Sequence, residues 1–405
     1  MSGRRELPGF LSVFSLRSFR LLWTGAFVSS AGTWTQDVAL SWLIYARFGN
    51  PFLLGLRSFA AEAPLLAFML VGGAVADRVD RRRILLTSQV VQMSLAAVLG
   101  LLYAGGRLGM AAIVVVAFLT GTAQSQSAPT YQAVLTTVVP PEKIPNAVAL
   151  NSLQFNLSRV VGPMLAGLLL AHVGTGACFA VNVLSFLAVI VALLRIEIPS
   201  PVTTGRESLA QSLRAGIRHV TASRVLSALT LLGLAGSFLA FPLITYLPVI
   251  AGDVLGTGAA GYSALLSSFG VGAIVGAIAT AQRGQAPSRG RLALRAFVVY
   301  GLCTIVAVFS PRQALSMALL VVSGAALVTA TSTLNSLVQE NAPDAFRGRV
   351  LSIYGLAFRG GMPLGSLAAG PFVTALGAPV VLAGLCAALV LGAALQLSSG
   401  RVRSL

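Results

Sequence analysis

The sequence is poor in acidic residues and in charge of either sign, and this shortage excludes a water-soluble protein. Only 11 of its 405 residues are Asp or Glu, against 28 Lys and Arg, and charged residues make up 10% of the chain. Soluble domains carry about 25% charged residues. Hydrophobic residues instead reach 56%, and the mean hydropathy is +0.86. We therefore expect a protein embedded in a membrane.

Cysteine and histidine are also scarce. The three cysteines lie inside apolar runs without Cys-x-x-Cys or Cys/His spacing, and there are only two histidines. This pattern argues against a disulfide framework and against a metal site. The sequence has no phosphate-binding Gly-x-x-x-x-Gly-Lys-Ser/Thr pattern and no Ser/His/Asp or Cys/His arrangement. We expect no cofactor, no metal and no enzyme activity.

Long apolar runs predict the fold class. A membrane-spanning helix needs about 20 apolar residues, and the chain has room for about twelve. The 42 glycines favour close packing of such helices. The predicted spans are 19–46, 53–76, 84–105, 109–131, 147–171, 175–196, 225–250, 258–281, 293–311, 313–336, 349–374 and 377–397. We expect an all-α membrane protein with twelve transmembrane helices.

The arginines predict the orientation of these spans. Basic residues gather in every second gap, most densely at 78–83 and again near 401–403. Loops rich in Lys and Arg stay in the cytoplasm. The pattern predicts a multi-pass protein of the cytoplasmic (inner) membrane with both termini in the cytoplasm. We assign the net charge of +17 to this role and expect no nucleic acid partner, because no soluble domain is available to present a basic patch.

An internal repeat divides the chain into two halves. Pro141-Glu142 matches Pro343-Asp344, and Gly162 matches Gly365, with an offset of 202 to 203 residues. The polar stretch 198–222 lies between the two copies. We predict an N-terminal six-helix bundle (1–197), a cytoplasmic linker (198–222) and a C-terminal six-helix bundle (223–405), the duplication that many transporters use.

The gap between the second and third spans carries the most specific motif. Gly73, Ala76, Asp77, Arg78, Arg81 and Arg82 fit the signature G-x-L-A-D-R-x-G-R-R, with departures at Val75 and Asp80. With this motif, the chain resembles the major facilitator superfamily over essentially its whole length. The segment Phe19-Arg20-Leu21-Leu22-Trp23 resembles the subgroup of enterobactin exporters and macrolide-efflux-like proteins. The resemblance implies the major facilitator fold, with two pseudo-symmetric six-helix bundles.

The resemblance also implies a conformational latch, formed by Gly73, Asp77, Arg78, Arg81 and Arg82. Asp77 lies at the cytoplasmic end of a span, where a carboxylate can pair with Arg and with the positive N-terminus of a helix. The alternative is that the arginines anchor this loop to anionic lipid.

A second motif lies in the fifth span. Gly162, Pro163 and Gly167 are similar to the Gly-Pro-x-x-Gly-Gly signature of antiporters, with Ala166 in place of a glycine. Because proline removes a backbone donor, these residues predict a helix bend. Ordinary close helix packing is the alternative.

Two arginines are expected inside the membrane, where a charge is costly and marks a functional site by default. Arg159 and Arg359 fall near the midplane of the fifth and eleventh spans. A guanidinium there can hold an anionic or catechol-like substrate by paired hydrogen bonds; a purely structural arginine is the alternative. Helical spacing adds further candidates for a polar cavity wall. These are Thr33, Thr120, Gln124, Ser127, Tyr131 and Asn156.

Two carboxylates lie in the outer half of the first two spans, Asp37 and Glu62. Carboxyls in a low-dielectric cavity gain affinity for protons, so either can couple transport to a proton gradient. The alternative is an ion pair with Arg47 or Arg57 near the outer surface.

The leading hypothesis is a proton-coupled exporter of small amphipathic molecules, such as drugs, siderophores or secondary metabolites, that works by alternating access. The alternatives are an importer or facilitator of a small nutrient, and a non-transporting receptor or assembly subunit. The expected partners are the lipid bilayer, a small-molecule substrate and protons, and we expect the protein to be a monomer.

Overall fold

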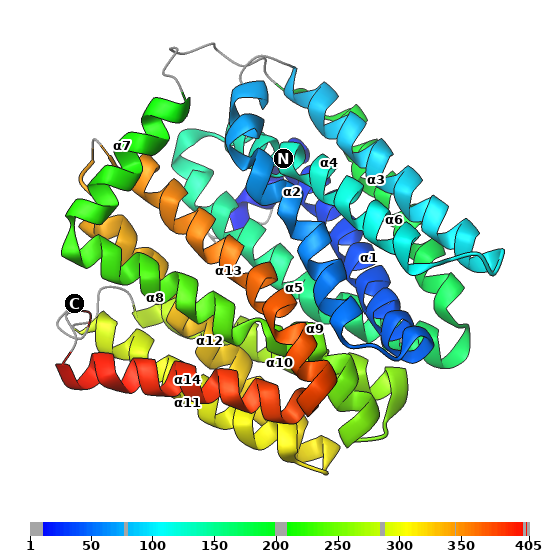
Figure 1. Cartoon of the computed structure of the whole chain (residues 1–405). Coiled ribbons are helices and arrows are strands. Elements are labelled where there is room, and N and C mark those ends of the chain that lie inside the picture. Colours follow the sequence, from blue (N-terminus) through cyan, green and yellow to red (C-terminus); the bar gives the residue numbers. More distant parts are fainter. Residues whose placement is uncertain are drawn as a thin grey trace, which may run out of the picture. The chain divides into compact units, whose positions relative to one another are not determined.

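The structure is a computed structural model of the chain, and it describes residues 11–76, 80–198, 209–283, 288–344, 346–399 and 402. Within these ranges the side chains of 69–76, 209–213, 215, 283 and 399 are not described. All regular structure in the described ranges is helical (Figure 1). The elements are η1 (Leu11–Ser15), α1 (Arg17–Phe48), α2 (Phe52–Ala76), α3 (Arg81–Ala104), α4 (Met110–Thr137), η2 (Pro141–Lys143), α5 (Ile144–His172), α6 (Thr175–Arg195), α7 (Leu209–Ala222), α8 (Arg224–Ala240), α9 (Pro242–Val249), η3 (Ile250–Val254), α10 (Gly258–Arg283), α11 (Arg289–Phe309), α12 (Gln313–Asn341), α13 (Arg347–Leu376) and α14 (Ala378–Ser399).

The predicted all-α membrane fold is confirmed, with one break. Among the described residues, nine helical segments are long and apolar enough to cross a membrane. The predicted span 225–250 is not one continuous α-helix, because α8 ends at Ala240 and α9 begins at Pro242. Proline has no N–H to continue the ladder and fits best in the first turn of a new helix. The chain then widens into the π-helical turn η3.

The segment expected as a linker, 198–222, contains the helix α7. Gly216 of α7 packs against Arg349 of α13, since a Cβ added at Gly216 would lie 3.2 Å from the Arg349 Cβ. The His219 ring stacks on the Phe346 ring, with centroids 4.6 Å apart and planes 4° apart. The Ser223 hydroxyl accepts a hydrogen bond from the Leu226 N–H and caps α8. The last part of this segment is therefore folded onto α8 and α13.

The contacts divide the chain into two compact units. The first comprises residues 1–38 and 67–205, and the second comprises 39–66 and 206–405. The last third of α1 and the first three-fifths of α2 thus belong to the second unit by contact, although they precede the repeat boundary in sequence. The division into domains at 197 and 223 stays a prediction.

In the first unit, α1 lies between α5 and α6. Trp23 Nε1 donates to the Leu150 carbonyl at 2.8 Å, and Thr35 Oγ1 donates to the Gly162 carbonyl at 3.1 Å. Both pairs are 127 residues apart, so positions increase together along α1 and α5, and the two helices run parallel. Parallel first and fifth helices follow when each intervening helix crosses the membrane once.

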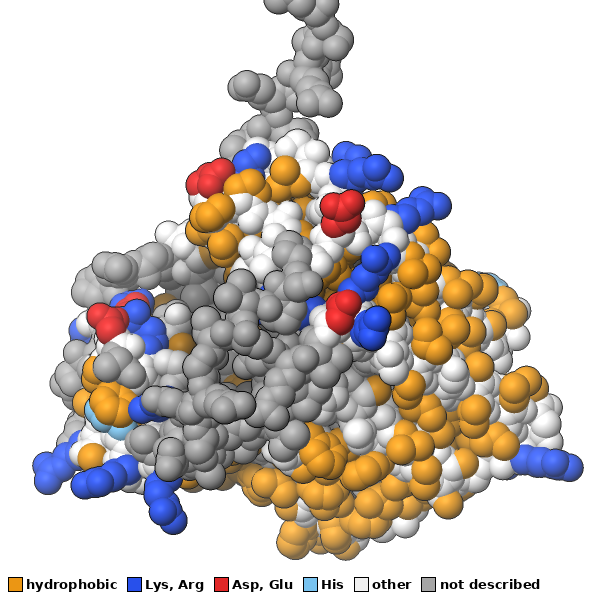
Figure 2. Space-filling model, turned by 90° about the horizontal axis from the view of Figure 1, so that it is seen from above, with side chains coloured by type: hydrophobic (Ala, Val, Ile, Leu, Met, Phe, Trp, Pro, Cys, Tyr) orange, Lys and Arg blue, Asp and Glu red, His pale blue; other side chains and the backbone are white. Residues whose placement is uncertain are grey.

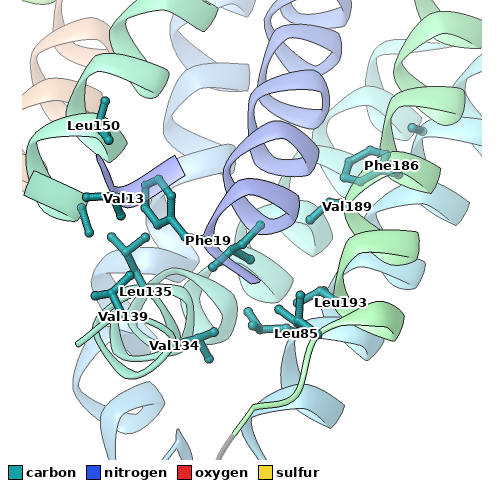
Figure 3. Packing of buried hydrophobic residues seen from close by; sticks show 14 residues of the cluster. Val13, Phe19, Leu85, Val134, Leu135, Val139, Leu150, Phe186, Val189 and Leu193 are labelled. Carbon is teal, nitrogen blue, oxygen red and sulfur yellow. The ribbon is translucent and has the colours of Figure 1, made fainter. Parts of the chain in front are cut away.

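Buried apolar residues close one end of this unit. Val13 of η1 and Phe19 of α1 are fully buried against Leu135 of α4 and Leu150 of α5 (Figure 3). Leu193 of α6 belongs to the same cluster. Each such side chain contributes about 1.5–3 kcal/mol on burial from water. The short helix η1 is therefore fixed to the ends of four membrane helices.

The second unit repeats the helix pairs of the first. Contacts of α3 with α4 and α6 recur as contacts of α11 with α12 and α14. Gly365, the repeat partner of Gly162, lies where α13 packs on α8, since a Cβ there would come 2.8 Å from the Phe238 carbonyl carbon. At Gly162 a Cβ would come 2.8 Å from the Ala31 carbonyl oxygen of α1. Each glycine lets the fifth helix of its repeat approach the first.

Large apolar side chains cover the outside of both units. Leu101 of α3, Leu184 of α6 and Leu395 of α14 are 73%, 62% and 67% exposed. Figure 2 shows hydrophobic side chains over much of the visible face. Patches of this extent on a soluble protein would drive aggregation, and here they are the surface that meets lipid.

We expect Gly365→Val to destabilise the protein strongly, because the added carbons meet the backbone of α8 rather than a flexible side chain. The melting temperature of the protein in detergent should fall by at least about 5 °C. Gly384→Val on α14 is the matched control, since a Cβ at Gly384 meets nothing within 4 Å. Equal melting temperatures for the two variants would contradict this packing.

Candidate functional site

Arg159 lies at the middle of α5, as the sixteenth of its 29 residues. Its guanidinium carbon lies 5.3 Å from the centroid of the Trp34 ring on α1 and 5.9 Å from that of the Phe155 ring. Within the part of the chain that the structure describes, Arg159 has neither an ion pair nor a side-chain hydrogen bond. Among the described residues, Arg159 is thus in contact with two aromatic rings, those of Trp34 and Phe155.

The energies show that these rings do not satisfy the charge. An arginine at the centre of a membrane helix costs about 2.5–3.5 kcal/mol or more. A cation–π contact returns about 0.5–1 kcal/mol at exposed sites and about 2 when desolvated. The guanidinium also carries five N–H donors in its plane, and these need hydrogen-bond acceptors that the two rings do not supply. The polar edge therefore needs water or a polar ligand.

The face of α5 that carries Arg159 is open and polar. Ser152 is exposed, Asn156 and Arg159 are half-buried, and Phe155 is 52% exposed. The opposite face, with Gln154, is buried in the protein. A polar face that lies at mid-membrane and is not packed against protein belongs in a water-filled cavity, because lipid contact would leave its donors unsatisfied.

Pro163 adds an acceptor to this site. In a regular helix the N–H of residue 163 would donate to the carbonyl of Arg159, four residues earlier. Proline has no N–H, so that carbonyl loses its intrahelical partner. The helix continues through Pro163 to His172. Pro163 thus leaves the backbone carbonyl of Arg159 itself without its usual donor, while the bend predicted at Gly162, Pro163 and Gly167 remains a prediction.

The other polar candidates of the first unit are divided between open and packed positions. On α4, Gln124 is exposed, Thr120 is half-buried and Ser127 is buried, with its hydroxyl on the Gln124 carbonyl at 3.3 Å. The Tyr131 hydroxyl is buried and has no hydrogen-bond partner among the described residues. Thr33 donates to the Ser29 carbonyl at 3.0 Å and lies against Asn182 of α6. Gln124 is thus the most open of the α4 candidates.

In the second unit, Arg359 occupies a comparable level of α13, as the thirteenth of 30 residues, and it is exposed. Its neighbour Phe358 stacks on Tyr354 at 6.1 Å and meets Phe241 edge-on at 5.8 Å. These rings cover the break between α8 and α9. No ring contact of Arg359 itself is found among the described residues, so it lacks the aromatic frame of Arg159.

The two candidate coupling carboxylates are each half-buried in their helices. Asp37 is the twenty-first of 32 residues in α1, and Glu62 is the eleventh of 25 in α2. Both make polar or electrostatic contacts. Their placement is compatible with proton binding and with ion pairing.

Of the predicted latch residues, Asp77 and Arg78 lie outside the described residues. Gly73 lies in α2, but the burial of its position is not described. Arg82 donates to the Leu194 carbonyl at the last turn of α6, at 2.6 Å. Asp80, where the superfamily more often has glycine, accepts from the Arg82 N–H at 2.8 Å and caps α3. The Arg81 Nε is buried without a hydrogen bond within the described part of the chain.

Sequence reasoning missed a group of contacts in the second unit. They join the end of α1 and the start of α2 to η3 and α13, and we call this group the α1–α2 seam. The Tyr45 hydroxyl of α1 donates to Asp253 of η3 at 2.5 Å, and a side chain at Gly252 would overlap the Tyr45 ring. Thr374 of α13 donates to the Asn50 side chain at 3.2 Å. The seam lies at the end of the helices that the charge pattern predicts to face outward.

The seam continues along α2. A Cβ at Gly55 would lie 2.6 Å from the Ser366 carbonyl oxygen, to which the Tyr246 hydroxyl donates at 2.6 Å. A Cβ at Gly370 would lie 2.8 Å from the Phe52 ring. These contacts could not be predicted from the glycines and tyrosines of a single sequence, because the hydrogen-bonded residues of the seam lie about 200 to 320 positions apart in the chain.

A second missed contact is the ion pair of Arg289 with Glu340, which joins the start of α11 to the end of α12 through both carboxylate oxygens. A signal was available, since Glu340 is the only acidic residue between Asp253 and Asp344. A single acidic residue at the end of a long apolar segment predicts an ion pair with a nearby basic residue.

An all-helical membrane fold in which helix pairs of the first unit recur in the second is the fold of major facilitator transporters. The pattern of the transmembrane secretion effector family of this superfamily matches residues 9–404. The chain belongs to that family, and it is an efflux-type membrane transporter rather than an enzyme. This confirms the resemblance inferred from the loop between α2 and α3.

Individual relatives are also membrane transporters. The multidrug efflux pump Tap of Mycolicibacterium fortuitum is 27% identical over 88% of this chain and 89% of its own length. The staphyloferrin A transporter of Staphylococcus aureus is 23% identical over 86% of this chain and 87% of its own. The crystal structure of a D-xylose–proton symporter superposes with a TM-score of 0.74 over 97% of this chain and all of that chain, at 15% identity, which supports the fold alone.

We expect Tyr45→Phe to loosen the α1–α2 seam without changing its shape. A hydrogen bond to a carboxylate contributes about 1.5–3 kcal/mol, so the population with an open seam should rise about tenfold or more. Spin labels at Arg47 and Ala260 on the purified protein would report a longer distance by pulsed electron resonance. Tyr103→Phe is the matched control, because Tyr103 lies on α3 in the first unit. An unchanged distance distribution in Tyr45→Phe would contradict the role of this bond.

Proposed function

We propose that the protein is a proton-driven exporter of small amphipathic molecules, such as drugs, siderophores or secondary metabolites, that works as a monomer in the cytoplasmic membrane with both termini in the cytoplasm. The observation that carries the proposal is the family match over residues 9–404. The names of the relatives, a multidrug efflux pump and a siderophore transporter, support the substrate range.

Asp37 is the proposed proton carrier, with Glu62 as a second candidate. Asp37 lies on α1, three residues and so nearly one helical turn from Trp34, which contacts Arg159. A carboxyl so close to the candidate binding face can respond to whether the site holds substrate. Proton binding from outside and release inside would then drive the cycle, and the α1–α2 seam would open once in each turnover.

The latch is proposed at the opposite end. Gly73, Asp77, Arg78, Arg81 and Arg82 would hold the cytoplasmic ends together in one conformation. The bond from Arg82 to the end of α6 supports part of this role, because it ties the start of α3 to the neighbouring helix. A cation at a helix C-terminus is also favourable in itself.

We expect Asp37→Asn to abolish transport driven by a proton gradient while substrate exchange at equal concentrations continues, because exchange needs no net proton movement. Proteoliposomes with an imposed pH gradient and a panel of fluorescent probes, including carboxyfluorescein and rhodamine 6G, would measure both. In the wild type, a protonophore should reduce concentrative transport to the background level.

The matched control is Glu142→Gln, which neutralises an exposed acid in the short helix η2 before α5. It should transport as the wild type does. Concentrative efflux that persists without a gradient would refute proton coupling, and uptake by intact cells in the absence of efflux would favour the importer.

A further inference from the structure

We infer that Arg159, Trp34 and Phe155 form a subsite for an organic anion with a planar apolar body, with the anionic group on the guanidinium edge and the apolar body on the rings. This inference rests on the proposed transport function and names the substrate class of the same site. It differs from a general polar cavity in two respects: the ligand carries a negative charge, and its apolar part is flat.

The absence of a carboxylate at Arg159 is the first argument. Structural arginines in membranes pair with acids or with backbone carbonyls. Elsewhere in the described residues, Arg289 pairs with Glu340 and Arg347 pairs with Asp344. Arg159 has no such partner in that part of the chain. The position that a carboxylate would take is therefore available to a ligand.

The aromatic neighbours are the second argument. Trp34 comes from α1 and Phe155 from the preceding turn of α5, so the guanidinium is held by rings from two helices. Arginine presents paired N–H donors in its plane, which match the two oxygens of a carboxylate. Phe155 is 52% exposed, so its ring also offers apolar surface beyond the arginine.

The packing of α1 on α5 is the third argument, because it fixes the distance between the ring and the charge. Gly162 lets the Trp34 Cβ and the Ala31 carbonyl approach α5, and Thr35 donates to the Gly162 carbonyl at 3.1 Å. The Arg159 side chain therefore meets the Trp34 ring at a place set by backbone contacts. A site prepared in this way loses little freedom on binding.

The test compares two ligands with the same ring and different charge, naphthalene-2-carboxylate and naphthalene-2-carboxamide. Isothermal titration of the full-length protein in lipid nanodiscs would give both dissociation constants. The wild type should bind the carboxylate about tenfold more tightly than the amide or better, as expected for a paired charge-assisted bond. Arg159→Gln should remove that preference and leave amide binding unchanged.

Three further variants separate the ring contact, the charge and the fold. Trp34→Ala should weaken both ligands by similar factors and keep their ratio. Arg159→Lys should keep part of the preference, because it retains the charge without the paired donors. Arg107→Gln removes an equal charge at an exposed turn and should behave as the wild type.

The inference is overturned if the wild type binds the amide as tightly as the carboxylate, if neither ligand saturates, or if Arg159→Gln keeps the preference while Arg159→Lys does too. Any of these results leaves proton-driven efflux standing, because that is measured by transport of the dyes. Conversely, loss of gradient-driven transport would not alter the two binding constants.

Discussion

The close approach of α1 to α5 is the contact on which the rest of the first unit depends. It is possible because residue 162 has no side chain, which lets the Trp34 Cβ and the Ala31 carbonyl lie against the helix. One turn away, the same approach places the Trp34 ring on Arg159. A bulkier residue at 162 would separate the two helices and would also move the Trp34 ring away from Arg159, so helix packing and the geometry of the candidate site cannot vary independently.

The membrane spans could be predicted from the sequence because hydrophobic length is a local property. Eleven of the predicted spans each fall on one helix, with at most two residues beyond its ends, and the remaining span, 225–250, is broken before Pro242, a residue visible in the sequence. The loop motif was equally readable. The aromatic partner Phe155 could have been found, since it precedes Arg159 by four residues on the same helix face.

The remaining contacts join distant residues, and a single sequence holds no sign of them. Trp34 and Arg159, Tyr45 and Asp253, and Asn50 and Thr374 meet only because particular helices pair. Helical spacing also gave Thr33 and Ser127 as cavity residues, and their roles stay predictions: Thr33 is half-buried beside Asn182 of α6, and Ser127 is buried. Period alone does not distinguish a face that lines a cavity from one that touches another helix.

The docking of α7 has a practical consequence for expressing the protein in two pieces. Because Gly216 and His219 pack on Arg349 and Phe346 of α13, α7 shares the second unit's contacts although it precedes the second repeat. A polypeptide cut placed within residues 209–222 would expose the aromatic stack and strip the support from α8. The chain should therefore be divided before Leu209 when two complementing fragments are expressed, so that the second fragment keeps α7 packed on α13.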